Sequence, residues 1–179
     1  MTAAGRLKRA APRCATLGRM TITLQPMTEA EFAAYQADQV PDYAQQKVRS
    51  GQWPAAEALA LAQREVAGLL PQGLATPDHR LFTLRDDDGQ LVGWLWVAEQ
   101  PRADGARCAY VYDVVIRPER RREGWATQAF TALEAHARVR GLAAIGLHVF
   151  GHNHGARALY EQLGFVATSV VMSKPLDGA

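Results

Sequence analysis

The chain has few cysteines and no long apolar run, and each shortage narrows the class of protein. Its two cysteines, Cys14 and Cys108, lie far apart and show no metal-ligand or redox spacing, so we expect a reduced, cytoplasmic environment. No apolar run approaches the roughly 18 residues that span a bilayer. The first residues also lack the apolar segment of a secretory signal. These shortages predict a soluble protein with no membrane partner.

Acidic residues are missing from the first 19 positions, which hold five basic side chains: Arg6, Lys8, Arg9, Arg13 and Arg19. The whole chain has a formal charge of +2, so removing these five positive charges leaves −3 for the rest. Overall basicity therefore gives no support to nucleic-acid binding. We interpret residues 1–19 as a disordered tail and residues 20–179 as the folded domain. An organellar transit peptide, or a start codon chosen ahead of Met20, fits the same composition.

The rest of the composition suits one globular domain with a sizeable core, because 48% of the 179 residues are hydrophobic and 21% are charged. Apolar patterns predict strands over residues 21–27, 80–85, 91–99, 108–116, 144–150 and 165–172. Capping signals and apolar periodicity predict helices that begin at Thr28, near Pro54, near Gly124 and at Asn153.

The order of these elements predicts the fold class. Residues 86–89, Asp-Asp-Asp-Gly, are typical of a hairpin turn, and a looser stretch with Pro41 and Gly51 separates the first two helices. We expect an α/β, or α+β, domain with a central mixed sheet of about six to seven strands and helices on both faces. A ligand would then bind at the carboxyl ends of the strands.

The segment 114–127 joins the strand 108–116 to a helix through a short basic turn with Gly124 and the small Ala126. Backbone N–H groups at a helix start lack intrahelical partners and lie at the positive end of the helix dipole. They can therefore bind a diphosphate. By itself this is a weak signal, since a helix-capping turn with solvated arginines has the same sequence.

Residues 153–165 supply a second motif, Asn-x-x-Ala-x-x-Leu-Tyr-x-x-x-Gly-Phe. Together with the strand-Pro-x-x-Arg-x-x-Gly-x-Ala segment about thirty residues earlier, it resembles the GCN5-related N-acetyltransferases over residues 80–172. The resemblance implies acetyl-coenzyme A as co-substrate and transfer of its acetyl group to an amine of a small molecule or a peptide N-terminus.

The resemblance also assigns cofactor contacts. Backbone groups of Val114, Val115 and Ile116 would pair with the pantetheine arm, which requires the sheet to splay beside this strand, and Asn153 would bond the same arm. The diphosphate would lie on the turn, formed by Arg121, Arg122, Glu123, Gly124, Trp125, Ala126 and Thr127. Arg122, Glu123 and Trp125 depart from the family pattern. A carboxylate beside a diphosphate is unfavourable unless Glu123 turns away.

Direct attack of an amine on a thioester needs a neutral amine and a proton for the departing thiolate. The motif resemblance gives the donor role to Tyr160, whose alternative is core packing. Asp113, in a buried strand, and His148, on the next strand, are both candidates for the base. For His148 a structural role is an equal alternative.

Other classes fit less well. His148, His152 and His154 lack zinc spacing and a nearby cysteine or carboxylate, so we expect no metal. Neither a phosphate-loop Lys-Ser/Thr pair nor Gly-x-Gly-x-x-Gly is present, which disfavours a nucleotide-binding protein. A non-catalytic acyl-coenzyme A sensor or structural module remains the alternative to the enzyme, and Glu123 is the residue that would suit it. Oligomeric state is open, with a homodimer among the arrangements allowed.

Overall fold

The computed structural model describes residues 21–174, so the predicted tail over residues 1–19 lies outside the described residues. One five-stranded sheet has the order β1-β2-β3-β4-β5. Neighbouring strands are antiparallel except β4 and β5, which are parallel. The strands are β1 (Thr23–Pro26), β2 (His79–Arg85), β3 (Leu91–Pro101), β4 (Arg107–Ile116) and β5 (Ala144–Leu147).

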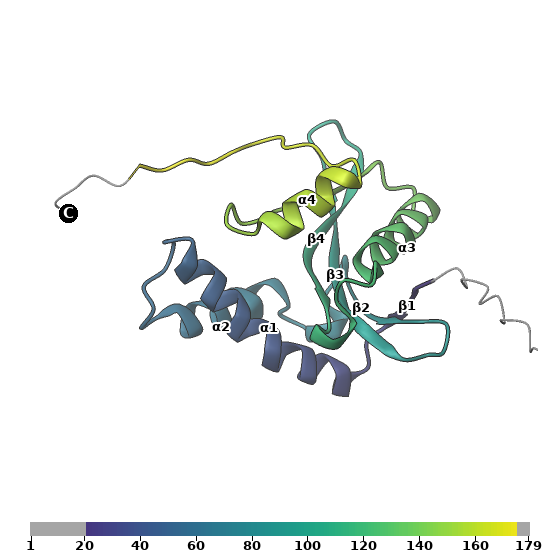
Figure 1. Cartoon of the computed structure of the whole chain (residues 1–179), viewed down its shortest axis with the longest axis horizontal. Coiled ribbons are helices and arrows are strands. Elements are labelled where there is room, and N and C mark those ends of the chain that lie inside the picture. Colours follow the sequence, from purple (N-terminus) through teal and green to yellow (C-terminus); the bar gives the residue numbers. More distant parts are fainter. Residues whose placement is uncertain (1–20, 175–179) are drawn as a thin grey trace, which may run out of the picture.

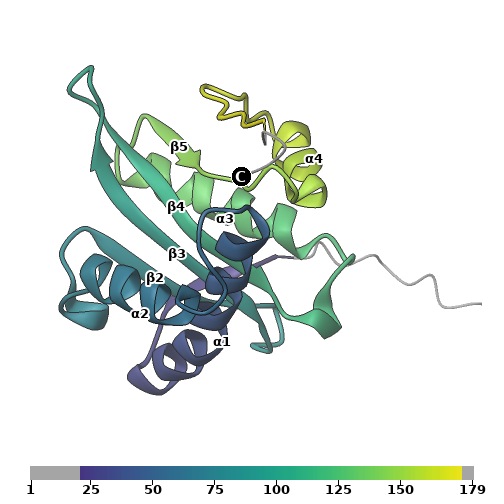
Figure 2. The ribbon, with the colours of Figure 1, turned by 90° about the vertical axis from the view of Figure 1, so that its left-hand side faces the viewer.

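Helices cover both faces of the sheet, as predicted (Figures 1 and 2). Helices α1 and α2 lie over one face, where α1 packs on the aromatic side chains of Trp94 and Trp96. Helix α3 lies over the other face against Leu95 and Val97, and α4 follows it. Successive residues of a strand point to opposite faces, so β3 feeds both cores. The helices are α1 (Glu29–Arg49), α2 (Ala58–Leu69), α3 (Trp125–Val139) and α4 (His154–Gln162).

Helix α1 begins where the sequence predicts and ends later than predicted. Its N-terminus has the capping box expected from Thr28 and Glu31. We expected a looser stretch around Pro41, but the helix continues through that residue to Arg49. Proline costs the helix a backbone hydrogen bond. Burial of Val40 and Ala44 on either side of it against α2 holds the helix together.

The sheet has five strands, so the expected count of six to seven was too high. Residues 165–172, predicted as the last strand, follow α4 as an extended segment without a strand partner. Strand β5 also ends at Leu147, before the predicted end at residue 150. The local pattern was strand-like in both places. A strand needs hydrogen bonds from a neighbour, and within residues 21–174 nothing pairs with either stretch.

A β-bulge in β4 separates that strand from β5. Trp96 pairs with Asp113 while Val97 pairs with Val111, so Tyr112 is the extra residue. Parallel pairing with β5 covers only residues 108–111 of β4. A bulge bends its strand and increases the local twist. The later part of β4 therefore diverges from β5, which is the splay that the predicted pantetheine contact would require.

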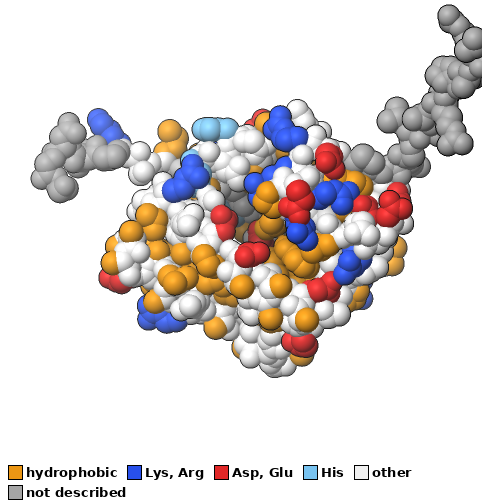
Figure 3. All heavy atoms as spheres, turned by 60° about the horizontal axis from the view of Figure 1, so that its bottom comes forward, with side chains coloured by type: hydrophobic (Ala, Val, Ile, Leu, Met, Phe, Trp, Pro, Cys, Tyr) orange, Lys and Arg blue, Asp and Glu red, His pale blue; other side chains and the backbone are white. Residues whose placement is uncertain are grey.

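The surface of the folded part mixes charges of both signs. Acidic and basic side chains are interspersed with apolar ones on the face shown in Figure 3. Among the described residues, no helix combines the length and the apolar character that crossing a membrane would need.

Candidate active site

The turn before α3 has the backbone geometry of an anion site. Gly124 is the N-cap of α3 with φ of 87°, a left-handed conformation that glycine adopts without steric cost. No side chain caps the helix, and its first turn contains no acidic residue. The N–H groups of Trp125, Ala126 and Thr127 lack intrahelical acceptors because they form the first turn. They are available to an anion.

Glu123, the acidic residue of this turn, is hydrogen-bonded to two of its neighbours. Its Oε2 accepts a hydrogen bond of 2.7 Å from Nε1 of Trp125 and one of 3.5 Å from Nε of Arg120. The Arg120 guanidinium also lies 4.8 Å from the centre of a Trp125 ring and bonds Asp86 at 2.9 Å. Trp125 is 7% exposed. Its buried indole thus orients the carboxylate, and Arg120 offsets the charge.

The two arginines that follow have different surroundings. Arg121 donates from Nε to the carbonyl of Ile116 at 3.0 Å, which ties the turn to the end of β4. Arg122 is exposed and has φ of 65°, an uncommon conformation for a residue with a side chain. Positive φ at both Arg122 and Gly124 folds the turn tightly ahead of the helix.

Val114, Val115 and Ile116 lie just past the bulge. Val114 and Ile116 pack against the core on the α3 side, and Val115 packs on the α1 side. Their strand pairs with β3 on one edge, whereas β5 pairs with β4 only up to Val111. The backbone edge of residues 114–116 that faces β5 is therefore free of strand pairing.

Asp113 lies at the bulge with a buried tyrosine as its partner. Tyr35, from α1 and 1% exposed, donates its hydroxyl proton to Oδ2 of Asp113 at 2.8 Å. Burial raises the pKa of Asp113 to about 6; the charge of Asp42 adds to this rise, and the bond from Tyr35 opposes it. The same burial and the carboxylate raise the pKa of Tyr35 well above its ordinary value.

Tyr160 lies on α4 with its ring against the α3 core. Its ring centre is 5.5 Å from that of Phe130 and 5.7 Å from that of Phe165. Burial, and then the charge of Asp113, raise the pKa of Tyr160 to about 12. The ring of Tyr160 is therefore packed in the core, as the structural alternative predicted. Its hydroxyl group is close enough to Asp113 for the charge of that residue to affect its pKa.

The remaining predicted residues lie in the segment between β5 and α4. Asn153 is the N-cap of α4, and its Oδ1 accepts from the N–H of Ala156 at 3.2 Å. His148 falls beyond the end of β5, is exposed, and contacts the ring of Phe150. Its ring therefore faces Phe150 and solvent, unlike the buried pair of Asp113 and Tyr35.

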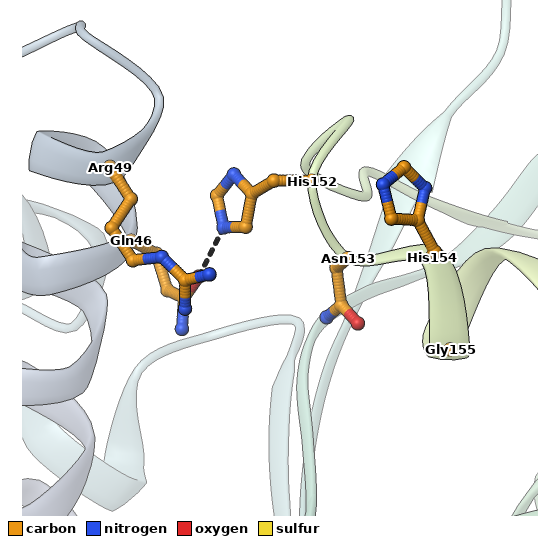
Figure 4. Close-up of a pocket in the computed structure, with 6 residues that line it drawn as sticks. All are labelled: Gln46, Arg49, His152, Asn153, His154 and Gly155. Atoms are coloured by element: carbon orange, nitrogen blue, oxygen red, sulfur yellow. Dashed lines mark hydrogen bonds between the residues drawn. The ribbon is translucent and has the colours of Figure 1, made fainter.

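A polar cavity of about 330 Å³ opens between the end of α1 and this segment (Figure 4). Nε2 of His152 and Oε1 of Gln46 are 2.6 Å apart, which bridges the segment to α1. Arg49 extends along the same side of the cavity. The lining residues are Gln46, Arg49, His152, Asn153, His154 and Gly155.

Sequence reasoning missed Tyr35, Gln46 and Arg49. Tyr35 follows the apolar pattern of a helix face, and no motif marks its hydroxyl. One signal was present in the sequence: Tyr35, Gln39, Asp42, Gln46 and Arg49 recur at alternating spacings of four and three. That spacing places polar groups on one face of a helix. It becomes visible only when the helix is known to continue through Pro41.

Three features of this site agree with one class of protein, the acetyltransferases. The sheet splays after a bulge, the helix that follows has an uncapped start, and a buried acid lies beside them. The model of the Acetyltransferase (GNAT) family matches residues 36–165, and the chain belongs to that family. It is thus an acetyltransferase. Members of this family generally use acetyl-coenzyme A as co-substrate and an amine as acceptor.

Two proteins of Bacillus subtilis (strain 168) match nearly the whole folded part. The uncharacterized N-acetyltransferase YycN is 43% identical over 157 residues, which cover 88% of this chain and 100% of YycN. YdgE, also an uncharacterized N-acetyltransferase, is 32% identical over 157 residues, covering 88% of this chain and 99% of its own. The crystal structure of YycN has a TM-score of 0.83 at 42% identity and covers 87% of this chain and 99% of YycN.

Proposed function

We propose that this chain binds acetyl-coenzyme A and transfers the acetyl group by direct attack of an acceptor amine, with Asp113 as base and Tyr160 as proton donor. The observation that carries the proposal is the electrostatic coupling of these two side chains. Asp113 has a pKa raised to about 6, and its charge helps to raise the pKa of Tyr160 to about 12. Two titratable groups whose surroundings shift their pKa values, and which influence one another, are typical of an acid–base site.

The residues of the turn and of β4 fit the proposed co-substrate. Uncapped N–H groups at the start of α3 suit a diphosphate, with Gly124 leaving room for its oxygens. The free edge of residues 114–116 suits the amide groups of pantetheine, which bind an extended backbone as a further strand would. Asn153 keeps its amide N–H groups for the same arm while its oxygen caps α4. Bound there, acetyl-coenzyme A supplies the thioester carbonyl and the thiolate leaving group.

Asp113 is the better of the two candidates for the base. An acceptor amine arrives largely as an ammonium ion, because the pKa of an alkylamine is near 10. With a pKa of about 6, Asp113 is ionised at neutral pH and can take that proton, yet holds it more firmly than an ordinary carboxylate. Tyr35 fixes the orientation of the carboxylate through the 2.8 Å bond. His148 is exposed and bound to neither group.

Proton uptake by Asp113 also prepares Tyr160 for its role. The phenol with a pKa of about 12 is a weak acid toward a thiolate, whose pKa resembles that of cysteine, about 8.5. Once Asp113 is neutral, one cause of the raised pKa of Tyr160 is gone. The proton of the phenol then transfers more readily to the departing sulfur. The two steps are thereby coupled in the order that the reaction needs.

The polar face of α1 supports an elongated, polar acceptor. One end of this face bonds Asp113 through Tyr35, and the other end reaches the cavity at Gln46 and Arg49. Gln46 lies eleven positions after Tyr35 along the helix, a rise of about 16 Å. A small amine with a polar tail, or a peptide N-terminus, fits this length better than a compact apolar amine.

Free thiol release from acetyl-coenzyme A, measured over a panel of amines and peptide N-termini, tests the proposal. We expect release to depend on the acceptor and to give the acetylated amine by mass spectrometry. The matched variant is Tyr160→Phe, which keeps the ring packing on Phe130 but removes the proton. Its turnover should fall about a hundredfold, within the usual range for loss of an acid, with affinity for acetyl-coenzyme A nearly unchanged.

Binding of acetyl-coenzyme A without thiol release on any acceptor would instead favour the sensor alternative. Wild-type turnover in Tyr160→Phe would remove Tyr160 from the donor role while leaving the enzyme assignment intact. The Glu123 argument for a decayed site is weakened, because Trp125 and Arg120 hold that carboxylate.

A further inference from the structure

The polar cavity at the end of α1 contains a positive charge and no acidic side chain. Arg49 is one of its six lining residues, and none of the other five is an acid. Within residues 21–174 Arg49 forms no ion pair, whereas Arg120 and Arg140 each bind a carboxylate. Its side chain extends from α1 toward the segment with His152 (Figure 4). A guanidinium in this situation is suited to a planar carboxylate, which it binds through two parallel hydrogen bonds.

Gln46 adds a second donor to the cavity, and His152 fixes its orientation. Oε1 of Gln46 lies 2.6 Å from Nε2 of His152. An amide oxygen can only accept, so His152 is the donor in this bond. The amide N–H groups of Gln46 are then left to donate to a ligand beside Arg49. One guanidinium and one amide match a carboxylate, whereas a phosphate, with nearly two negative charges, would call for a second cation.

The other end of the polar face of α1 is acidic. Asp113 is bonded to Tyr35, and Asp42 follows Tyr35 by seven positions, or two turns, on the same face. The face therefore changes from negative near Asp113 to positive at Arg49. A ligand that lies along it should have an ammonium group at one end and a carboxylate at the other. The rise of about 16 Å between these ends equals about four to five extended residues.

Between the two ends, Gln39 has an amide oxygen without a partner. Its Oε1 is buried and accepts no hydrogen bond in the described part of the chain, and an unpaired buried acceptor destabilises a protein. Gln39 lies four positions after Tyr35 and seven before Gln46, so it shares their face. The side chain is only partly buried, and its terminal torsion rotates easily. Rotation of the amide presents the oxygen to a ligand donor such as a peptide N–H.

We propose that the acceptor is a peptide with a carboxylate about four to five residues after its N-terminal amine. The amine lies at Asp113, a backbone N–H donates to Gln39, and the carboxylate accepts from Arg49 and Gln46. This inference rests on the proposed function for the chemistry at the amine, and on the cavity for the carboxylate. The opposite charges also fix the direction of the peptide, because a reversed peptide would place like charges together at both ends.

Isothermal titration calorimetry of the full chain with saturating coenzyme A tests the carboxylate site. The probes are pentaalanine and pentaalanine amide, which differ only in the terminal carboxylate. We expect pentaalanine to bind about ten- to a hundredfold more tightly, the usual range for hydrogen bonds to a charged group. Dialanine and its amide should bind alike, because two residues cannot reach both ends of the face.

A third probe distinguishes the two sources of such a carboxylate. Ala-Ala-Ala-Ala-Glu amide carries it on a side chain, as the N-terminus of a longer chain would. Binding as tight as that of pentaalanine would assign the site to an acidic residue of a longer chain. Binding as weak as that of pentaalanine amide would assign it to the carboxyl terminus of a short peptide.

Arg49→Gln should remove the preference for the free acid, so that pentaalanine and its amide bind within about twofold of one another. The matched control is Arg64→Gln, at an exposed arginine of α2 that lies outside the cavity, and it should keep the full preference. Circular dichroism of both variants checks that the fold is retained.

Equal binding of pentaalanine and its amide to the wild-type protein would overturn the proposal, as would a preference that persists in Arg49→Gln. Thiol release separates this result from the proposed function. Tighter binding of the free acid without thiol release on any acceptor would keep the carboxylate site and remove the reaction. Thiol release with equal binding of acid and amide would keep the reaction and remove the carboxylate site.

Discussion

Asp113 combines a cost for stability with its proposed role as the catalytic base. Burial raises its pKa to about 6, so the folded protein holds this proton more tightly than the unfolded chain, in which an aspartate has a pKa near 4. An acid whose pKa is raised in the folded protein stabilises the folded state at low pH. That contribution is lost as the pH rises through about 6. At neutral pH the ionised carboxylate therefore destabilises the fold.

Replacing Asp113 by Asn should stabilise the protein at high pH and reduce its activity. Asparagine still accepts the hydrogen bond from Tyr35 but carries no charge to desolvate. We expect the melting temperature to rise by a few degrees near pH 8, with the gain shrinking near pH 5, where the wild-type residue is largely protonated. Differential scanning calorimetry at both pH values measures it. An equal change at the two pH values would contradict a raised pKa.

Some residues of the candidate site could be predicted from the sequence, and others could not. Asp113 and Tyr160 could be proposed from their strand and motif, and the structure brings them within electrostatic reach. Tyr35 could not, because its partner lies 78 positions away and only the packing of α1 on the sheet joins them. The hydrogen bond that holds the Glu123 carboxylate comes from a buried indole whose position the sequence does not show.

Among the helices and strands, too, some features could be predicted from the local sequence and others depended on tertiary contacts. Local signals predicted the capping box of α1, the hairpin between β2 and β3 and the starts of α3 and α4, since each depends on residues close in sequence. The passage of α1 through Pro41 depended on burial against α2, which is a tertiary effect. The predicted last strand failed for lack of a partner edge within the described chain.

The turn before α3 makes a prediction about cofactor binding. Gly124→Val should abolish the thermal shift caused by acetyl-coenzyme A, because the side chain fills the space for the diphosphate and valine disfavours a φ of 87°. The matched control is Gly141→Val, at the other end of α3, where φ is 68° and an added Cβ meets nothing within 4 Å. Both variants carry a similar backbone strain of about 1–2 kcal/mol.

Only the variant in the turn should lose the response to acetyl-coenzyme A. A retained thermal shift in Gly124→Val would remove the diphosphate from this turn. A loss in both variants would point to a general effect of strain on the fold, and the phosphate assignment would then lose its support.

At the scale of the whole molecule, the fold of the family is combined with a cavity between α1 and residues 152–155. The α/β class, the helices on both faces and the membership in the acetyltransferase family followed from motif order and periodicity, which are properties of the sequence. The cavity between α1 and residues 152–155, and the polar face of α1 leading to it, follow from packing. We propose that the acceptor binds at the second group of features, so its class depends on tertiary structure.

The pH dependence of kcat tests the central claim, that Asp113 is the base of an acetyl transfer. With saturating acetyl-coenzyme A and an accepted amine, kcat should rise with pH and level off above about 6, because Asp113 must be ionised to take the proton. Asp113→Asn should have a lower kcat and lack this limb, while still binding acetyl-coenzyme A. A limb near pH 6 that persists in Asp113→Asn with undiminished turnover would contradict the account.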